Sequence, residues 1–267
     1  MKSLIIILNF SIFIQKILLS SEDYKYISHS SWITIKIFKT GMQNIYYNAK
    51  NWEKIFDEYS LFNKPDAIYI NETKQTSVDY QYYLSNNYNI IKLEWNNPVK
   101  VGSGMFWNCD SIAEIDFSEF DSSNIKEMLK MFEVCSSLTS INFRNFDASK
   151  VIYMGYMFAN CSSLSSLDLS NFNTSSATWM NNMFENCGSL TSLDLSNFDT
   201  SKVTNMDYMF NNCNSLIYLD LSNFNTSLIN SMYCMFNNCA KLEFLNIKNF
   251  ITYDKYTFAY NVFWNSK

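Results

Sequence analysis

A column of acidic and amide side chains recurs every 26 residues from Asp116 onward. Such a row of oxygens could bind a basic partner or a divalent cation, or could form a solvated ladder of hydrogen bonds between repeats. With Arg144 beside it, this candidate binding column consists of Asp116, Asn142, Asp168, Asp194, Asp220 and Asn246. Carboxylates about 5 Å apart would also suit a retaining glycosidase. A flat periodic face offers no substrate pocket, so we predict binding rather than catalysis.

A second column consists of cysteines at the same spacing, at Cys109, Cys135, Cys161, Cys187, Cys213 and Cys239. Neighbouring repeats could bring them within disulfide range. Stacked side chains point in parallel rather than toward each other, so we favour small side chains that fill the core. Cys234 lies outside the column, no C-x-x-C pair occurs and His29 is remote in sequence, so no metal site is predicted.

The composition argues against several functional classes. The 267 residues carry a net charge of −5 and include one histidine. That leaves little room for a Ser-His-Asp triad or a His-based zinc site. No block of Lys or Arg provides the positive footprint that nucleic acids require. We therefore expect a protein that is not an enzyme, uses no cofactor and binds no nucleic acid.

Both columns belong to one repeat, in which Met-Phe pairs recur every 26 residues from 105–106 to 235–236. In the copy that begins at Leu190, the spacing L-x-x-L-x-L predicts a strand with Leu193 and Leu195 on one face. Apolar residues then follow at steps of three and four, which predicts a short helix. They are Val203, Met206, Met209, Phe210, Cys213 and Leu216. No unit can bury its apolar face alone, so the predicted fold class is an α/β solenoid with one short parallel strand and one short helix per coil.

The repeat resembles the BspA-type leucine-rich repeat, a 26-residue repeat of surface proteins. The resemblance rests on the pattern MFxNCxSLxxLDLSNFDTSxVxxM and covers residues 101–250, which hold six copies. The first copy departs most, with Ile112 and Phe117 in place of leucine. The resemblance implies a secreted or surface-exposed protein that adheres to host or matrix proteins.

The two ends of the chain carry separate predictions. Residues 1–21 are predicted to be a signal peptide, with Lys2 before an apolar run, and an N-terminal strand or helix is the alternative. Residues 251–267 are expected to form a C-terminal cap or a truncated seventh repeat.

Residues 22–100 are predicted to form a small β-rich module that caps the first coil. Strands are expected at Ile33–Ile37, Ala67–Ile70 and Ile90–Trp95. Ile45–Tyr47 is expected to return as the hairpin partner of the first strand, and Trp52–Tyr59 to form a short helix.

These features predict a non-catalytic surface or secreted adhesion module, which binds a protein or glycan on another cell or matrix through its strand face. The alternative is an intracellular scaffold in the cytoplasm, where a reducing environment would suit the cysteines. Beyond the N-terminal signal, no segment is apolar enough to span a membrane. If the chain is secreted in a eukaryote, four sequons mark possible N-glycosylation sites. They are Asn71, Asn160, Asn173 and Asn225.

Overall fold

The structure is a computed structural model that describes residues 30–47, 64–251 and 262–263. The chain divides into two compact units, Met1–Ser30 and Ser31–Lys267, and nearly all described residues belong to the second. The predicted signal peptide, the helix at 52–59 and most of the C-terminal segment 251–267 lie outside the described residues.

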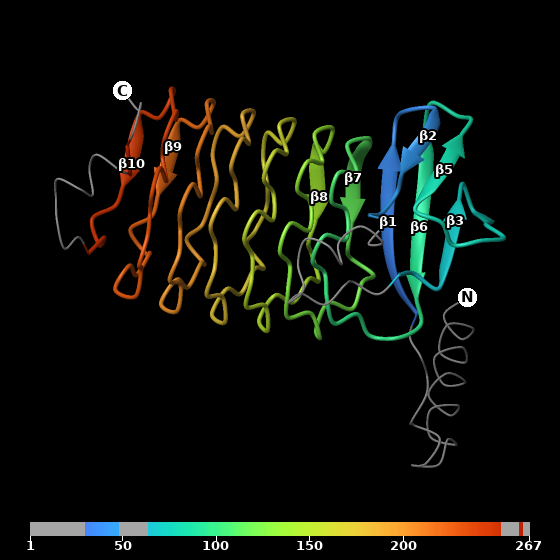
Figure 1. The fold of residues 1–267 in the computed structure, drawn as a ribbon, viewed down its shortest axis with the longest axis horizontal. Helices are drawn as coiled ribbons and strands as arrows, with labels where there is room; N and C mark the ends of the chain where they lie inside the picture. The colour runs from blue at the N-terminus through green and yellow to red at the C-terminus, as the bar shows by residue number, and fades with distance from the viewer. Residues whose placement is uncertain (1–29, 48–63, 252–261, 264–267) are drawn as a thin grey trace, which may run out of the picture. The chain divides into compact units, whose positions relative to one another are not determined.

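Within residues 30–47 and 64–251, all secondary-structure elements are strands (Figure 1). They are β1 (Ser31–Ile37), β2 (Gly41–Asn44), β3 (Ala67–Ile70), β4 (Thr73–Lys74), β5 (Gln81–Leu84), β6 (Asn89–Trp95), β7 (Ile112–Asp116), β8 (Ser140–Asn142), β9 (Tyr218–Asp220) and β10 (Phe244–Asn246). They form three sheets, with the orders β4-β3-β6-β1-β7-β8, β10-β9 and β2-β5.

The six-stranded sheet joins the N-terminal segment to the first two repeats. Burial alternates strictly along β1: Ile33, Ile35 and Ile37 are fully buried, whereas the residues between them, such as Trp32, are partly exposed. It pairs antiparallel with β6 on one side and with β7 on the other. The expected hairpin of Ile45–Tyr47 with β1 is wrong, since the returning strand is β2, which pairs with β5.

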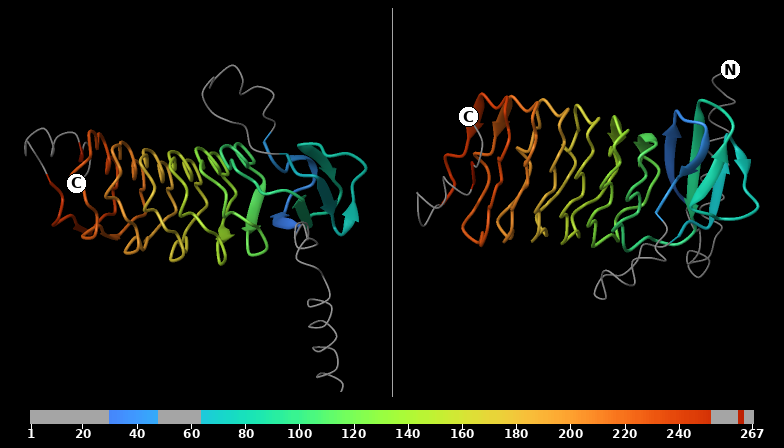
Figure 2. Two further views of the ribbon diagram at one scale, coloured as in Figure 1. Left: turned by 90° about the horizontal axis from the view of Figure 1, so that it is seen from below. Right: turned by 45° about the horizontal axis from the view of Figure 1, so that its top comes forward.

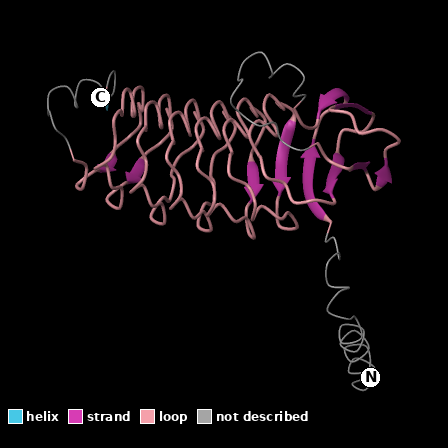
Figure 3. Cartoon of the chain, turned by 60° about the horizontal axis from the view of Figure 1, so that its bottom comes forward, coloured by secondary structure: helices cyan, strands magenta, loops and turns pink. Residues whose placement is uncertain are grey.

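The repeat array, residues 101–250, runs as successive windings that lie side by side (Figures 1 and 2). Neighbouring repeats pair in parallel, as β7 with β8 and β9 with β10. Elsewhere they meet through isolated bridges 26 residues apart, such as Tyr153 with Trp179. Most of each winding is turn and loop, as Figure 3 shows.

The predicted α/β solenoid with a helix in every coil is wrong, because small sheets and loops take its place and no helix occurs in the described repeats. The apolar steps of three come instead from tight turns. Met209 N donates to Met206 O at 3.3 Å, and Cys213 N donates to Phe210 O at 3.2 Å. In between, Phe210 N donates to Met235 O of the next repeat at 2.9 Å. An α-helix would require each of these N–H groups to donate four residues back.

Left-handed residues interrupt the same segment. Tyr208 has φ 55° and Asn212 has φ 60°, a conformation that no right-handed helix can contain. The two positions recur with positive φ in every winding, from Gly104 and Asn108 onward. Each winding therefore turns twice where the apolar spacing predicted continuous helix.

The core of the array is a row of phenylalanine rings from the Met-Phe pairs. Phe184 is fully buried, and its ring lies 5.6 Å from those of Phe158 and Phe210, at interplanar angles of 5° and 9°. Each repeat thus covers the ring of its neighbour, and a single copy would leave its ring exposed.

Candidate functional site

The candidate binding column lies along one side of the repeat array, called here the strand face. Asp116, Asn142, Asp220 and Asn246 are the last residues of β7, β8, β9 and β10. Asp168 and Asp194 hold the same register in repeats without a regular strand and are exposed. The predicted column is therefore one continuous row on the surface.

Each acidic side chain of this column closes a local turn. Asp194 Oδ1 accepts the backbone N–H of Ser196 at 2.9 Å, and Asp168 does the same with Ser170 at 2.9 Å. The N–H and then the hydroxyl of Ser196 lower the pKa of Asp194 below its ordinary value. Adjacent members also meet directly, since Asn142 Nδ2 donates to Asp116 Oδ1 at 3.0 Å. The column thus shapes the backbone and presents negative charge at neutral pH.

The fourth and fifth repeats form a groove of about 480 Å³ in the strand face. Asp194 and Asp220 both line it, together with the exposed ring of Tyr218. Beside it, the rings of Tyr218 and Phe244 stack at 4.5 Å and 4°. Arg144 is exposed and forms no ion pair with any described residue, so the structure does not bring it to the carboxylates.

No cluster of three His, Cys, Asp or Glu residues in the described parts of the chain could hold a metal ion. All seven cysteines are free and buried. The thiol of Cys187 donates to Phe158 O at 3.2 Å, and the same contact recurs from Cys135 to Cys239. Burial raises the pKa of the Cys187 thiol well above its usual value. The column cysteines therefore occupy the core as inert thiols.

The four sequon asparagines differ in their surroundings. Asn71, Asn173 and Asn225 are exposed. Asn160 instead belongs to a ladder, in which its Oδ1 accepts Asn186 Nδ2 at 2.9 Å. Of the four, Asn160 is the one whose side chain already links two repeats.

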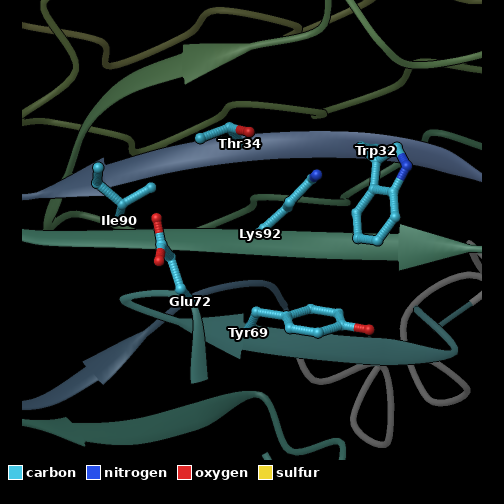
Figure 4. A pocket seen from close by; sticks show the side chains of 6 residues that line it. All are labelled: Trp32, Thr34, Tyr69, Glu72, Ile90 and Lys92. Carbon is cyan, nitrogen blue, oxygen red and sulfur yellow. The ribbon is translucent and has the colours of Figure 1, made fainter. Parts of the chain in front are cut away.

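No sequence motif pointed to the pocket of about 390 Å³ on the outer face of the N-terminal strands (Figure 4). Trp32 and Thr34 come from β1, Tyr69 from β3, and Lys92 from β6 between them. The remaining lining residues are Glu72 and Ile90. Glu72 lies in the turn between β3 and β4, and the other five occupy outward positions of alternating strands. Only the order β3-β6-β1 brings them together.

The pocket lies on the same sheet face as the start of the binding column. One row of residues crosses all six strands, and each member is the cross-strand partner of the next. The row is Lys74, Tyr69, Lys92, Thr34, Asp116 and Asn142. The pocket and the strand face therefore form one surface.

The family comparison concerns the repeat array. A family model described as "Mycoplasma protein of unknown function, DUF285" matches residues 100–194 and 188–267, which together are more than half of the chain. No curated protein and no solved structure matches the sequence. Within the described residues, no helix has the length and apolar character needed to cross a membrane.

Proposed function

The chain belongs to the DUF285 family, and from that premise we propose that it is a non-catalytic surface or secreted protein built on BspA-type leucine-rich repeats. Its strand face binds a protein or glycan on another cell or matrix. Six registered repeats give a long exposed row of side chains, which suits recognition of an extended partner.

The observation that carries this proposal is the acidic column beside the groove. Asp194 and Asp220 line the groove, and hydrogen bonds from Ser196 and Ser222 lower the pKa of both carboxyl groups. The face therefore carries negative charge over the physiological pH range, which favours partners with basic or hydroxyl groups. The neighbouring exposed rings of Tyr218 and Phe244 add apolar contact area.

Binding is tested with purified chain on an array of matrix proteins and glycans. The test variant changes Asp168, Asp194 and Asp220 to Asn, which removes the charge but keeps the Oδ1 acceptor, as Asn142 does naturally. We expect binding to the array to fall. Equal binding by this variant and the wild-type chain would show that the negative charge of the strand face does not contribute to binding.

The matched control changes Asp121, Asp147 and Asp199 to Asn. These aspartates also accept a backbone N–H from a serine two residues on, but they belong to a different column. Protease treatment of intact cells tests the location, because a surface protein is cleaved. A protected chain that retains residues 1–20 would support an intracellular scaffold instead.

A further inference from the structure

The pocket on the N-terminal sheet has one preorganised cation. Lys92 Nζ lies 3.6 Å from the centre of the Trp32 ring, which holds the ammonium group in place by a cation–π contact. Lys92 forms no ion pair with any described residue. Lys36, by contrast, is paired with Glu114 at 2.6 Å. Lys92 is therefore the one cation that lines the pocket, and it remains available to an external anion. Lys74 lies outside the lining, with its Nζ 5.5 Å from the centre of the Tyr69 ring.

The walls of the pocket suit a ring with hydroxyl groups. Trp32 and Tyr69 are 5.7 Å apart between ring centres and tilted by 55°, so they offer aromatic surface on one side. The electron-rich face of such a ring attracts the C–H groups of a sugar. Across the pocket, Glu72 can accept hydrogen bonds from hydroxyls, and Thr34 can donate or accept them. The volume of about 390 Å³ falls in the range of small-ligand sites.

We propose that this pocket binds a carboxylate-bearing sugar residue of a glycan. The sugar carboxylate pairs with Lys92, its ring packs against Tyr69, and its hydroxyls bond with Glu72 and Thr34. The rest of the glycan continues over the paired row toward Asp116 and the strand face. An acidic glycan is one class of partner for the proposed function. The inference rests on that function, because the pocket must face the outside of the cell to meet such a glycan.

Charge distinguishes this ligand from a phosphate group. Glu72 lines the pocket, and Glu94 lies beside it with Oε2 3.2 Å from the Tyr69 hydroxyl. These two carboxylates disfavour a dianion more strongly than a monoanion with polar groups. Phosphate sites in proteins use several cations or backbone N–H groups, and among the lining residues Lys92 is the one cation.

The test is a titration of the full chain with glucuronic acid and N-acetylneuraminic acid, followed by isothermal calorimetry or by ligand-observed NMR. Glucose and inorganic phosphate serve as the neutral and dianionic probes. We expect an acidic sugar to bind and glucose to bind at least about tenfold more weakly, because glucose lacks the charged contact with Lys92. Inorganic phosphate should also bind more weakly, because the carboxylates of Glu72 and Glu94 repel a dianion.

Variants assign the binding to the pocket. Lys92→Met removes the charge and keeps the stem, and it should weaken acidic-sugar binding about tenfold or more. Tyr69→Ala should weaken it as well, whereas Tyr69→Phe should retain it. Lys241→Met, an exposed lysine at the far end of the array, is the matched control and should leave the affinity unchanged. Circular dichroism checks that each variant is folded.

Three results would overturn the proposal: no binding of either acidic sugar, equal affinity for glucose, or preference for phosphate. Unchanged affinity in folded Lys92→Met would also overturn it. These outcomes are separate from the test of the proposed function, because the Asp→Asn variants of the strand face leave the pocket intact. A chain that binds the array through its aspartates but ignores acidic sugars would retain the proposed function and lose this inference.

Discussion

A buried threonine hydroxyl offers a sharp test of what joins neighbouring repeats. Thr200 is 1% exposed, and its Oγ1 accepts Asn225 N at 2.8 Å and donates to Asn225 O at 3.1 Å. Thr200→Val has nearly the same shape and removes both bonds. If hydrophobic burial decided the outcome, the added methyl group would stabilise the chain by about 0.8 kcal/mol.

The lost hydrogen bonds predict instead that Thr200→Val destabilises the chain. An unsatisfied buried polar group costs about 1–3 kcal/mol, and Thr200→Val leaves two of them on the backbone of Asn225. Asn225 itself is exposed, so water reaches this corner and the cost lies at the lower end. After subtraction of the methyl gain, we expect a net loss of about 1–2 kcal/mol in the free energy of unfolding. Thr200→Ser keeps the hydroxyl and should lose only about 1 kcal/mol for the missing methyl group.

Two measurements check this prediction. Urea unfolding followed by circular dichroism gives the overall stability, and Thr191→Val, at an exposed threonine, is the control and should be neutral within about 0.5 kcal/mol. Repeat arrays can open locally, so hydrogen exchange at the Asn225 amide gives the local effect, and it should quicken in Thr200→Val alone. A Thr200→Val chain as stable as wild type, with unchanged exchange at Asn225, would refute the reasoning.

Three further predictions concern the core, the thiols and the acidic column. Phe184→Ala should lower the unfolding free energy by about 3–5 kcal/mol in urea, whereas Phe244→Ala, at a ring that is 44% exposed, should cost clearly less; equal costs would contradict the role of the ring row. Cys187 and the other column thiols should not react with a disulfide reagent until denaturant is added, and rapid reaction of the native chain would show that they are accessible. The pKa of Asp194 is lowered from 3.8 in the folded chain, so its charge stabilises the fold above that pH and this contribution is lost on acidification. Asp194→Asn should therefore lose less stability between about pH 5 and pH 3 than wild type, and an equal loss in both chains would exclude this carboxylate as a cause.

The inward and outward pattern of the repeats could be predicted from the sequence, because it depends on local alternation. Leu193 and Leu195 are buried, and Asp194 between them is exposed, as expected. The helix could not be separated from a chain of tight turns by apolar spacing, since both place a residue inward every three or four positions. The asparagines at 160, 186 and 212 carried the missing signal, because Asn tolerates the left-handed conformation that ends a helix.

The role of the acidic column could also have been predicted in part. Asp-x-Ser occurs at Asp168 and Asp194, and aspartate commonly accepts the N–H two residues on. The pocket could not have been predicted, because it depends on β6 lying between β3 and β1, and that order comes from long-range pairing. Local patterns predict which side chains point outward, but only the strand order decides which of them are neighbours.

The turn function of the acidic column has a consequence for specificity. Asp or Asn occupies every position of the column, and in Asn142 and Asp194 alike the Oδ1 atom closes the same turn. Selection for a stable winding is therefore enough to maintain an acidic or amide side chain there. A feature kept in all repeats for folding cannot by itself distinguish one partner from another. Discrimination must come from exposed side chains without such a duty, such as Tyr218, which lines the groove, and Lys92, which lines the N-terminal pocket.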